Sequence, residues 1–132
     1  MAEEVAEREW EQLAQAAWAA RSHAYVIGPT RVGAAVLTGN GAIFTGCNVE
    51  HNFRSHDVHA EVNAITTMVT NGHHDIRAIL VVAERDRFTP CGACMDWIFQ
   101  FGGTSCIVAY QVAPTAEQII LTAAQLMPYY PF

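Results

Sequence analysis

The chain contains no lysine, and its seven basic residues are all arginines, set against 13 acidic residues. With a formal charge of -6 and no basic stripe, it is a poor match for a phosphate backbone, so we expect no nucleic-acid partner. No apolar run approaches membrane-spanning length, and no export signal is evident, so we expect no membrane association and a cytoplasmic location. Small neutral or cationic molecules suit this composition better as partners.

Internal repeats, low-complexity tracts and linkers are also missing, which bounds the domain organisation. At 132 residues, 52% of them hydrophobic, the sequence predicts one domain over residues 1–132 with one sizeable core. Cysteine is scarce. Cys47 and Cys106 lie in apolar segments and are expected to be small buried side chains. Cys91 and Cys94 stand close together as a pair of a different kind.

Hydrophobic periodicity and turn residues predict the elements. A helical apolar stripe runs through residues 3–20, and Gly39-Asn40-Gly41 separates two apolar runs as in a hairpin. Residues 48–58 have no period and are expected to form a loop. The full prediction is helix 3–20, strands 32–38 and 42–47, helix 59–71, strand 76–83, helix 91–101, strands 105–110 and 117–121, and helix 122–126.

This order of elements predicts the fold class. Strands that alternate with helices after an opening hairpin favour a mixed sheet covered on both faces. We therefore expect an α/β protein, a three-layer α/β/α sandwich with a five-stranded mixed sheet. Two sequence motifs fall at helix N-termini, where unpaired N–H groups and the helix dipole stabilise thiolates.

The first motif is His59-Ala60-Glu61 and the second is Pro90-Cys91-Gly92-Ala93-Cys94. One imidazole and two thiolates suit Zn²⁺, and three protein ligands leave a fourth position for water. A Cys-x-x-Cys pair alone is also found in redox pairs and structural zinc sites. The His-x-Glu upstream makes the combination specific, because a nearby glutamate can move that water's protons. The pattern is similar to the signature of zinc-dependent base deaminases.

Together with Gly46-Cys47-Asn48-Val49-Glu50, these motifs make the chain resemble the cytidine deaminase family. The resemblance extends from about residue 20 to the C-terminus through Ala24-Tyr25, Val32-Gly33-Ala34-Ala35 and Leu126-Met127-Pro128. It implies hydrolytic deamination of a cytosine nucleoside and a homotetramer. The roles it implies are zinc binding by His59, Cys91 and Cys94, proton transfer by Glu61, sugar binding by Asn48 and Glu50, and contact with the base by Ala60 and the Pro90-Cys91 turn.

Three positions depart from the usual family pattern and are expected to line the substrate site. Thr30 stands where a phenylalanine often packs on the pyrimidine, Phe53 lies in an unusual segment after Glu50, and Phe132 is one residue later than the usual C-terminal aromatic. We therefore expect cytidine to be a poorer substrate than a modified cytosine nucleoside. A blasticidin-S-type deaminase, a nucleotide or nucleic-acid deaminase, and a non-catalytic zinc module remain as alternatives.

Overall fold

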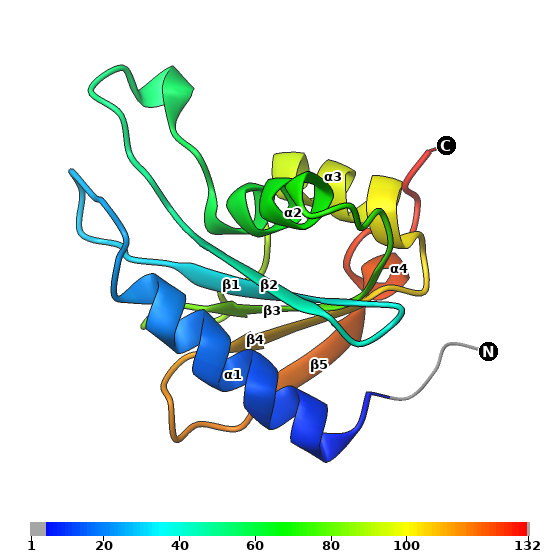
Figure 1. Ribbon diagram of the computed structural model, residues 1–132. Coiled ribbons are helices and arrows are strands. Elements are labelled where there is room, and N and C mark those ends of the chain that lie inside the picture. The colour runs from blue at the N-terminus through cyan, green and yellow to red at the C-terminus, as the bar shows by residue number, and fades with distance from the viewer. Residues whose placement is uncertain (1–4, 132) are drawn as a thin grey trace.

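The computed structural model describes residues 5–131 and consists of a twisted five-stranded sheet between two helical layers (Figure 1). The strands lie in the order β2-β1-β3-β4-β5. Helix α1 covers one face of the sheet, and α2, α3 and α4 cover the other (Figure 1). The elements are α1 (Glu7–Arg21), β1 (Gly33–Thr38), β2 (Ile43–Cys47), η1 (Arg54–His56), α2 (Ala60–Thr70), β3 (Ile76–Val82), α3 (Gly92–Gly102), β4 (Ile107–Gln111), β5 (Ile119–Thr122) and α4 (Ala123–Leu126).

The sheet is mixed, as the sequence predicts. Strand β1 pairs antiparallel with both β2 and β3, β3 pairs parallel with β4, and β4 pairs antiparallel with β5. Parallel neighbours need a crossover connection, and α3 supplies it between β3 and β4. The predicted three-layer arrangement and the order of the helices and strands are therefore confirmed.

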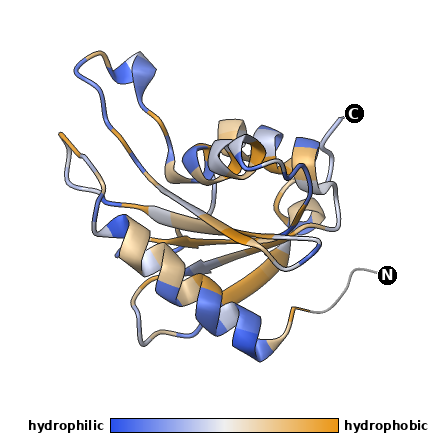
Figure 2. Ribbon diagram, in the orientation of Figure 1, coloured by the Kyte–Doolittle hydropathy of each residue, from blue (hydrophilic) through white to orange (hydrophobic). Residues whose placement is uncertain are grey.

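Each face of the sheet carries its own apolar core. On one side Leu13 and Ala17 of α1 are completely buried, which confirms the apolar stripe predicted for this helix. On the other side Ile65, Met68 and Ile98 of α2 and α3 are completely buried. Figure 2 shows the matching hydropathy, with apolar segments in the strands and hydrophilic residues mainly in the N-terminal half of α1. Among the described residues, no helix has the length and apolar character needed to cross a membrane.

The ends of the predicted elements differ from the structure by a few residues. The first helix begins at Glu7, where the Glu9 side chain accepts a hydrogen bond from the Ala6 backbone N–H at 3.1 Å. Glu3 and Glu4 lie outside the described residues. The segment 48–58, predicted as an irregular loop, contains the short helix η1, which no apolar period marks.

A close approach between β2 and α2 fixes where the His-x-Glu motif lies. A Cβ atom on Gly46 would lie 2.4 Å from the Ala64 backbone nitrogen and 2.7 Å from the Ala60 carbonyl oxygen, so only glycine fits without a shift. The Asn63 side chain also donates a hydrogen bond to the Cys47 carbonyl at 2.9 Å. The start of α2 is thereby held against the end of β2, which leads directly to Asn48.

Candidate active site

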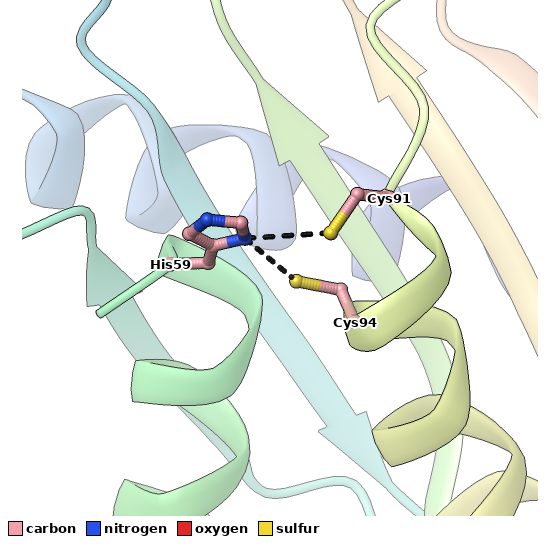
Figure 3. A group of neighbouring side chains, drawn as sticks. All are labelled: His59, Cys91 and Cys94. Atoms are coloured by element: carbon pink, nitrogen blue, oxygen red, sulfur yellow. Dashed lines mark hydrogen bonds between the residues drawn. The ribbon is translucent and has the colours of Figure 1, made fainter. Parts of the chain in front are cut away.

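Two helix N-termini meet beside the sheet and bring three soft ligand atoms together (Figure 3). His59 is the N-cap residue of α2, Cys91 is the N-cap residue of α3, and Cys94 lies in the first turn of α3. The His59 Nδ1 atom lies 3.3 Å from the Cys94 sulfur and 3.5 Å from the Cys91 sulfur. His59 is therefore in contact with two cysteines that lie 32 and 35 positions further along the sequence.

The three donor atoms fit a tetrahedral zinc ion. All lie within 4.8 Å of one another. Typical zinc–nitrogen and zinc–sulfur bonds at a tetrahedral angle would separate nitrogen from sulfur by about 3.6 Å. The donor chemistry agrees too, because one imidazole and two thiolates are ligands that suit Zn²⁺. Burial, with Glu61 and Cys91 nearby, raises the pKa of the Cys94 thiol above its ordinary value. A divalent cation would reverse that effect and stabilise the thiolate. His59, Cys91 and Cys94 thus form a site suited to Zn²⁺.

Glu61 lies in the first turn of α2, two residues after His59, and is 3% exposed. Burial raises the pKa of its carboxyl group, although its own backbone N–H and the neighbouring His59 act in the opposite direction. A carboxyl group with a raised pKa releases and regains a proton closer to neutral pH. Glu61 is therefore chemically suited to proton transfer beside the three ligand atoms.

A cavity of about 320 Å³ opens next to Glu61 and the ligand residues. Of the predicted substrate-binding residues, Thr30, Asn48, Glu50 and Ala60 line it. The complete lining is Thr30, Val32, Asn48, Glu50, Arg54, Asp57, Val58, His59, Ala60, Glu61, Arg85, Phe88, Thr89 and Cys91. Its size suits a small organic molecule. Three segments that are far apart in the sequence, residues 30–32, 48–61 and 85–91, thus line one cavity.

Asn48 is almost completely buried and fastens the loop before β1 to the end of β2. Its side-chain oxygen accepts a hydrogen bond from the Val32 N–H at 2.9 Å, and its side-chain nitrogen donates to the Thr30 carbonyl at 3.0 Å. A side-chain amide has a second N–H and a second acceptor site. Asn48 therefore shapes the cavity wall and keeps hydrogen-bonding capacity for a ligand.

Glu50 is held in place by the backbone of the neighbouring loop. Its Oε1 atom accepts hydrogen bonds from the Ile27 and Gly28 N–H groups at 2.6 and 2.7 Å. The Oε2 atom lies 3.2 Å from Nη2 of Arg54. The hydrogen bonds from Gly28 and Ile27 lower the pKa of the Glu50 carboxyl group, and Arg54 lowers it further. Glu50 is therefore an ionised acceptor at the cavity wall.

Three other predicted substrate-binding residues lie elsewhere. Pro90 is buried immediately before Cys91 but does not line the cavity. Phe53 is 70% exposed on the projecting loop, where its ring lies against His51 at a centroid distance of 5.9 Å. In this single chain Phe53 therefore does not reach the cavity. Phe132 lies outside the described residues.

The cavity also contains Phe88, Arg85 and Asp57, which the sequence analysis did not identify. Phe88 is half-buried and gives the cavity an aromatic side chain, so the loss of the usual aromatic at Thr30 does not leave it without one. Arg85 donates to the Thr30 hydroxyl oxygen at 2.9 Å. Arg54 and Asp57 contribute charges. For Arg54 a signal existed, because it belongs to the unusual segment after Glu50, four residues after Glu50 and three before Asp57.

The His59, Cys91 and Cys94 ligand set, with a buried carboxyl group two residues after the histidine, defines the class of zinc-dependent deaminases. Residues 7–110 match the family described as the cytidine and deoxycytidylate deaminase zinc-binding region. The chain therefore belongs to the cytidine deaminase family, whose members are hydrolases that act on C–N bonds.

Individual relatives agree with this membership. A probable cytidine deaminase from Dictyostelium discoideum is 45% identical over 74 residues, which are 54% of this chain and 50% of that protein. A cytidine deaminase from Sporosarcina psychrophila is 35% identical over 83% of this chain and 81% of its own length. The crystal structure of cytidine deaminase from Burkholderia pseudomallei superposes with a TM-score of 0.82 at 30% identity, covering 95% of this chain and 98% of that one.

Proposed function

We propose that this protein catalyses the hydrolytic deamination of cytidine or deoxycytidine to the uracil nucleoside, with release of ammonia. The observation that carries the proposal is the position of Glu61. Its buried carboxyl group stands beside the three zinc-ligand atoms and lines the same cavity as Asn48 and Glu50. One cavity, large enough for a nucleoside, is thus lined by the candidate proton carrier, residues of the metal site and two polar candidates for sugar binding.

In the proposed reaction Glu61 carries every proton. Zinc held by His59, Cys91 and Cys94 would make a water molecule acidic enough to attack near neutral pH. Glu61 accepts a proton from the attacking water and delivers it to N3 of the cytosine ring, while the oxygen adds to C4. It then takes the remaining proton from the oxygen that has added to C4 and passes it to the amino group, which leaves as ammonia while the C4 carbonyl forms.

The other cavity residues would bind and orient the nucleoside. Glu50 would accept a hydrogen bond from a sugar hydroxyl group as an ionised carboxylate. Asn48 has a second N–H that can donate to a sugar oxygen. Ala60 lies at the start of α2 and lines the cavity next to Glu61. Phe88 offers an aromatic surface on which the base can pack. This packing, worth on the order of 1 kcal/mol, would replace the packing lost at Thr30, where the family often has a phenylalanine.

Cytidine itself is the substrate that these observations favour. The relatives described above are all cytidine deaminases by name, and nothing in the cavity favours a blasticidin-S-type substrate. Phe88 removes one reason for expecting a modified base. A non-catalytic zinc module would not need a buried carboxyl group facing a cavity. We also propose a cytoplasmic location, because a reducing compartment keeps Cys91 and Cys94 available as thiolates.

A substrate panel tests this proposal directly. We expect ammonia release from cytidine and deoxycytidine, and much slower release from blasticidin S, adenosine and CMP. Ammonia can be followed by a coupled assay and the product by its ultraviolet spectrum. If blasticidin S or CMP is turned over with a higher kcat/KM than both nucleosides, the cytidine assignment is wrong.

Replacing Glu50 with alanine should weaken nucleoside binding. The change removes the acceptor for the sugar, so we expect KM for cytidine to rise by about tenfold or more, as for loss of a charged hydrogen bond. Glu84→Ala is the matched control, because this carboxylate is exposed and pairs with Arg21 outside the cavity lining. Equal KM values for the two variants would contradict a sugar-binding role for Glu50.

We further propose that the chain assembles as a homotetramer. Several large apolar side chains are exposed in the single chain, including Tyr25, Ile27, Phe53 and Ile120, and Tyr129 is 94% exposed. Covering such surface is a common reason for symmetric assembly of small proteins. Light scattering at micromolar concentration should give four times the mass of one chain. A stable monomer mass would contradict the proposal.

A further inference from the structure

Arg54 links the two carboxylates that border the opening of the cavity. Its Nε atom donates to Asp57 Oδ2 at 2.9 Å, and its Nη2 atom lies 3.2 Å from Glu50 Oε2. Asp57 is fixed on its other side, because Oδ1 accepts from the His51 N–H at 2.7 Å. All three charged side chains of this network line the cavity. Arg54 thus holds a defined position between two fixed anions.

The hydrogen bonds at Glu50 indicate which oxygen atom is available to a ligand. Oε1 already accepts from the Ile27 and Gly28 N–H groups, which accounts for its main acceptor directions. Oε2 has no such backbone donor among the described residues, and its neighbour is Arg54. A sugar hydroxyl group would therefore donate to Oε2, the atom whose position Arg54 controls.

Arg54 also keeps donors of its own. A guanidinium group has five N–H donors, and among the described residues only the Nε and Nη2 sides of Arg54 are engaged with carboxylates. Those that remain can donate to a hydroxyl oxygen next to the one that donates to Glu50. An arginine beside a carboxylate therefore offers an acceptor and a donor to two neighbouring hydroxyl groups.

A purely structural role does not account for this arrangement. The Arg54 side chain is 54% exposed, and ion pairs at that exposure add little to stability. The loop is already closed without Arg54, since Val49 and Val58 exchange two backbone hydrogen bonds at 2.8 Å. The charged network therefore contributes little to the stability of the fold, and we expect its main role to be ligand binding.

We infer that Arg54 is a specificity-determining residue, which orients Glu50 and donates to the sugar, so that together they select nucleosides with free hydroxyl groups on the sugar ring. This inference rests on the proposed function. It adds a residue and a sugar preference to that function, and it assigns Asp57 the task of positioning Arg54.

The test compares cytidine with 2′,3′-dideoxycytidine, which lacks both hydroxyl groups. In Arg54→Met, which keeps a long side chain without charge, we expect KM for cytidine to rise by about tenfold to a hundredfold with little change in kcat. For dideoxycytidine, kcat/KM should change by less than about threefold, because the removed contacts have no partner on that substrate. For Arg54→Lys we expect a KM for cytidine between those of the wild-type protein and Arg54→Met. Lysine keeps the positive charge but cannot hold both carboxylates in one plane.

Two further variants guard against a trivial explanation. Asp57→Asn keeps an oxygen for the His51 N–H but weakens the hold on Arg54, so it should lower the cytidine preference in the same direction. Arg8→Met removes an arginine charge from α1, on the opposite face of the sheet, and should leave both substrates unaffected. An equal loss for cytidine and dideoxycytidine in Arg54→Met would show a structural effect and overturn the inference. An unchanged preference would overturn it too.

Binding measurements separate this inference from the proposed reaction. Titration calorimetry on zinc-loaded protein gives dissociation constants for uridine and 2′,3′-dideoxyuridine without any turnover. If the wild-type protein releases no ammonia but binds uridine more tightly, and Arg54→Met removes that preference, the reaction is wrong and the sugar-binding role stands. If the wild-type protein does not prefer uridine, the role of Arg54 is wrong whatever the reaction.

Discussion

Glu61→Gln is expected to retain its fold and one zinc per chain while losing nearly all turnover. Glutamine has almost the same size and can still hydrogen-bond, but it cannot carry a proton. General acid–base groups contribute roughly 10²–10⁴-fold. Because Glu61 would serve several transfers in one reaction, kcat should fall by at least the upper part of that range. Steady-state ammonia release, with zinc measured by elemental analysis on the same sample, checks the prediction.

A control variant at another glutamate distinguishes the loss of proton transfer from a general effect of removing a negative charge. Glu84→Gln removes an exposed carboxylate outside the cavity lining and should leave kcat unchanged. Glu61→Gln should also bind uridine with little loss, because its deficit lies in the chemical steps. A Glu61→Gln enzyme with near-normal kcat would require a different proton carrier.

Cys94→Ala is expected to lose zinc and, with it, activity. Cys94 is completely buried and lies 3.3 Å from His59 Nδ1, so its replacement removes one of the three candidate ligand atoms. Loss of the metal removes several kcal/mol of transition-state stabilisation, which corresponds to a fall in kcat of roughly 10³-fold or more. Elemental analysis should find far less than one zinc per chain, and the melting temperature should no longer rise when zinc is added.

Cys106→Ala is the control for this change. Cys106 is also buried, and burial raises the pKa of its thiol to about 12, but it lies in the apolar core away from the ligand group. Its variant should keep one zinc and most of the activity at a modest cost in stability. If Cys94→Ala is zinc-free yet fully active, the metal serves only the fold, and the catalytic reading of the site fails.

The chemistry of the site could be predicted from the sequence because it depends on local spacing. His59 and Glu61 are two residues apart, Cys91 and Cys94 are three apart, and both pairs precede apolar residues at helical intervals. Helix N-termini follow from such patterns, and the structure places His59 and Cys91 at the N-cap positions. Likewise, Gly39-Asn40-Gly41 was sufficient to predict the hairpin between β1 and β2.

The surroundings of that chemistry were decided by tertiary structure alone. Phe88 has no periodic or motif signal, yet the turn before α3 places it in the cavity, while Phe53, predicted to line it, projects into solvent.

What the sequence determined by itself is thus the candidate zinc ligands, the candidate proton carrier and the order of elements, because these follow from the spacing of residues within each motif and each element. The cavity wall, the choice of which Glu50 oxygen accepts from the backbone and the position of Arg54 depend on contacts between the loops around residues 27 and 54. Contacts between irregular segments depend on the packing of the whole sheet and its helices, and no local period records them.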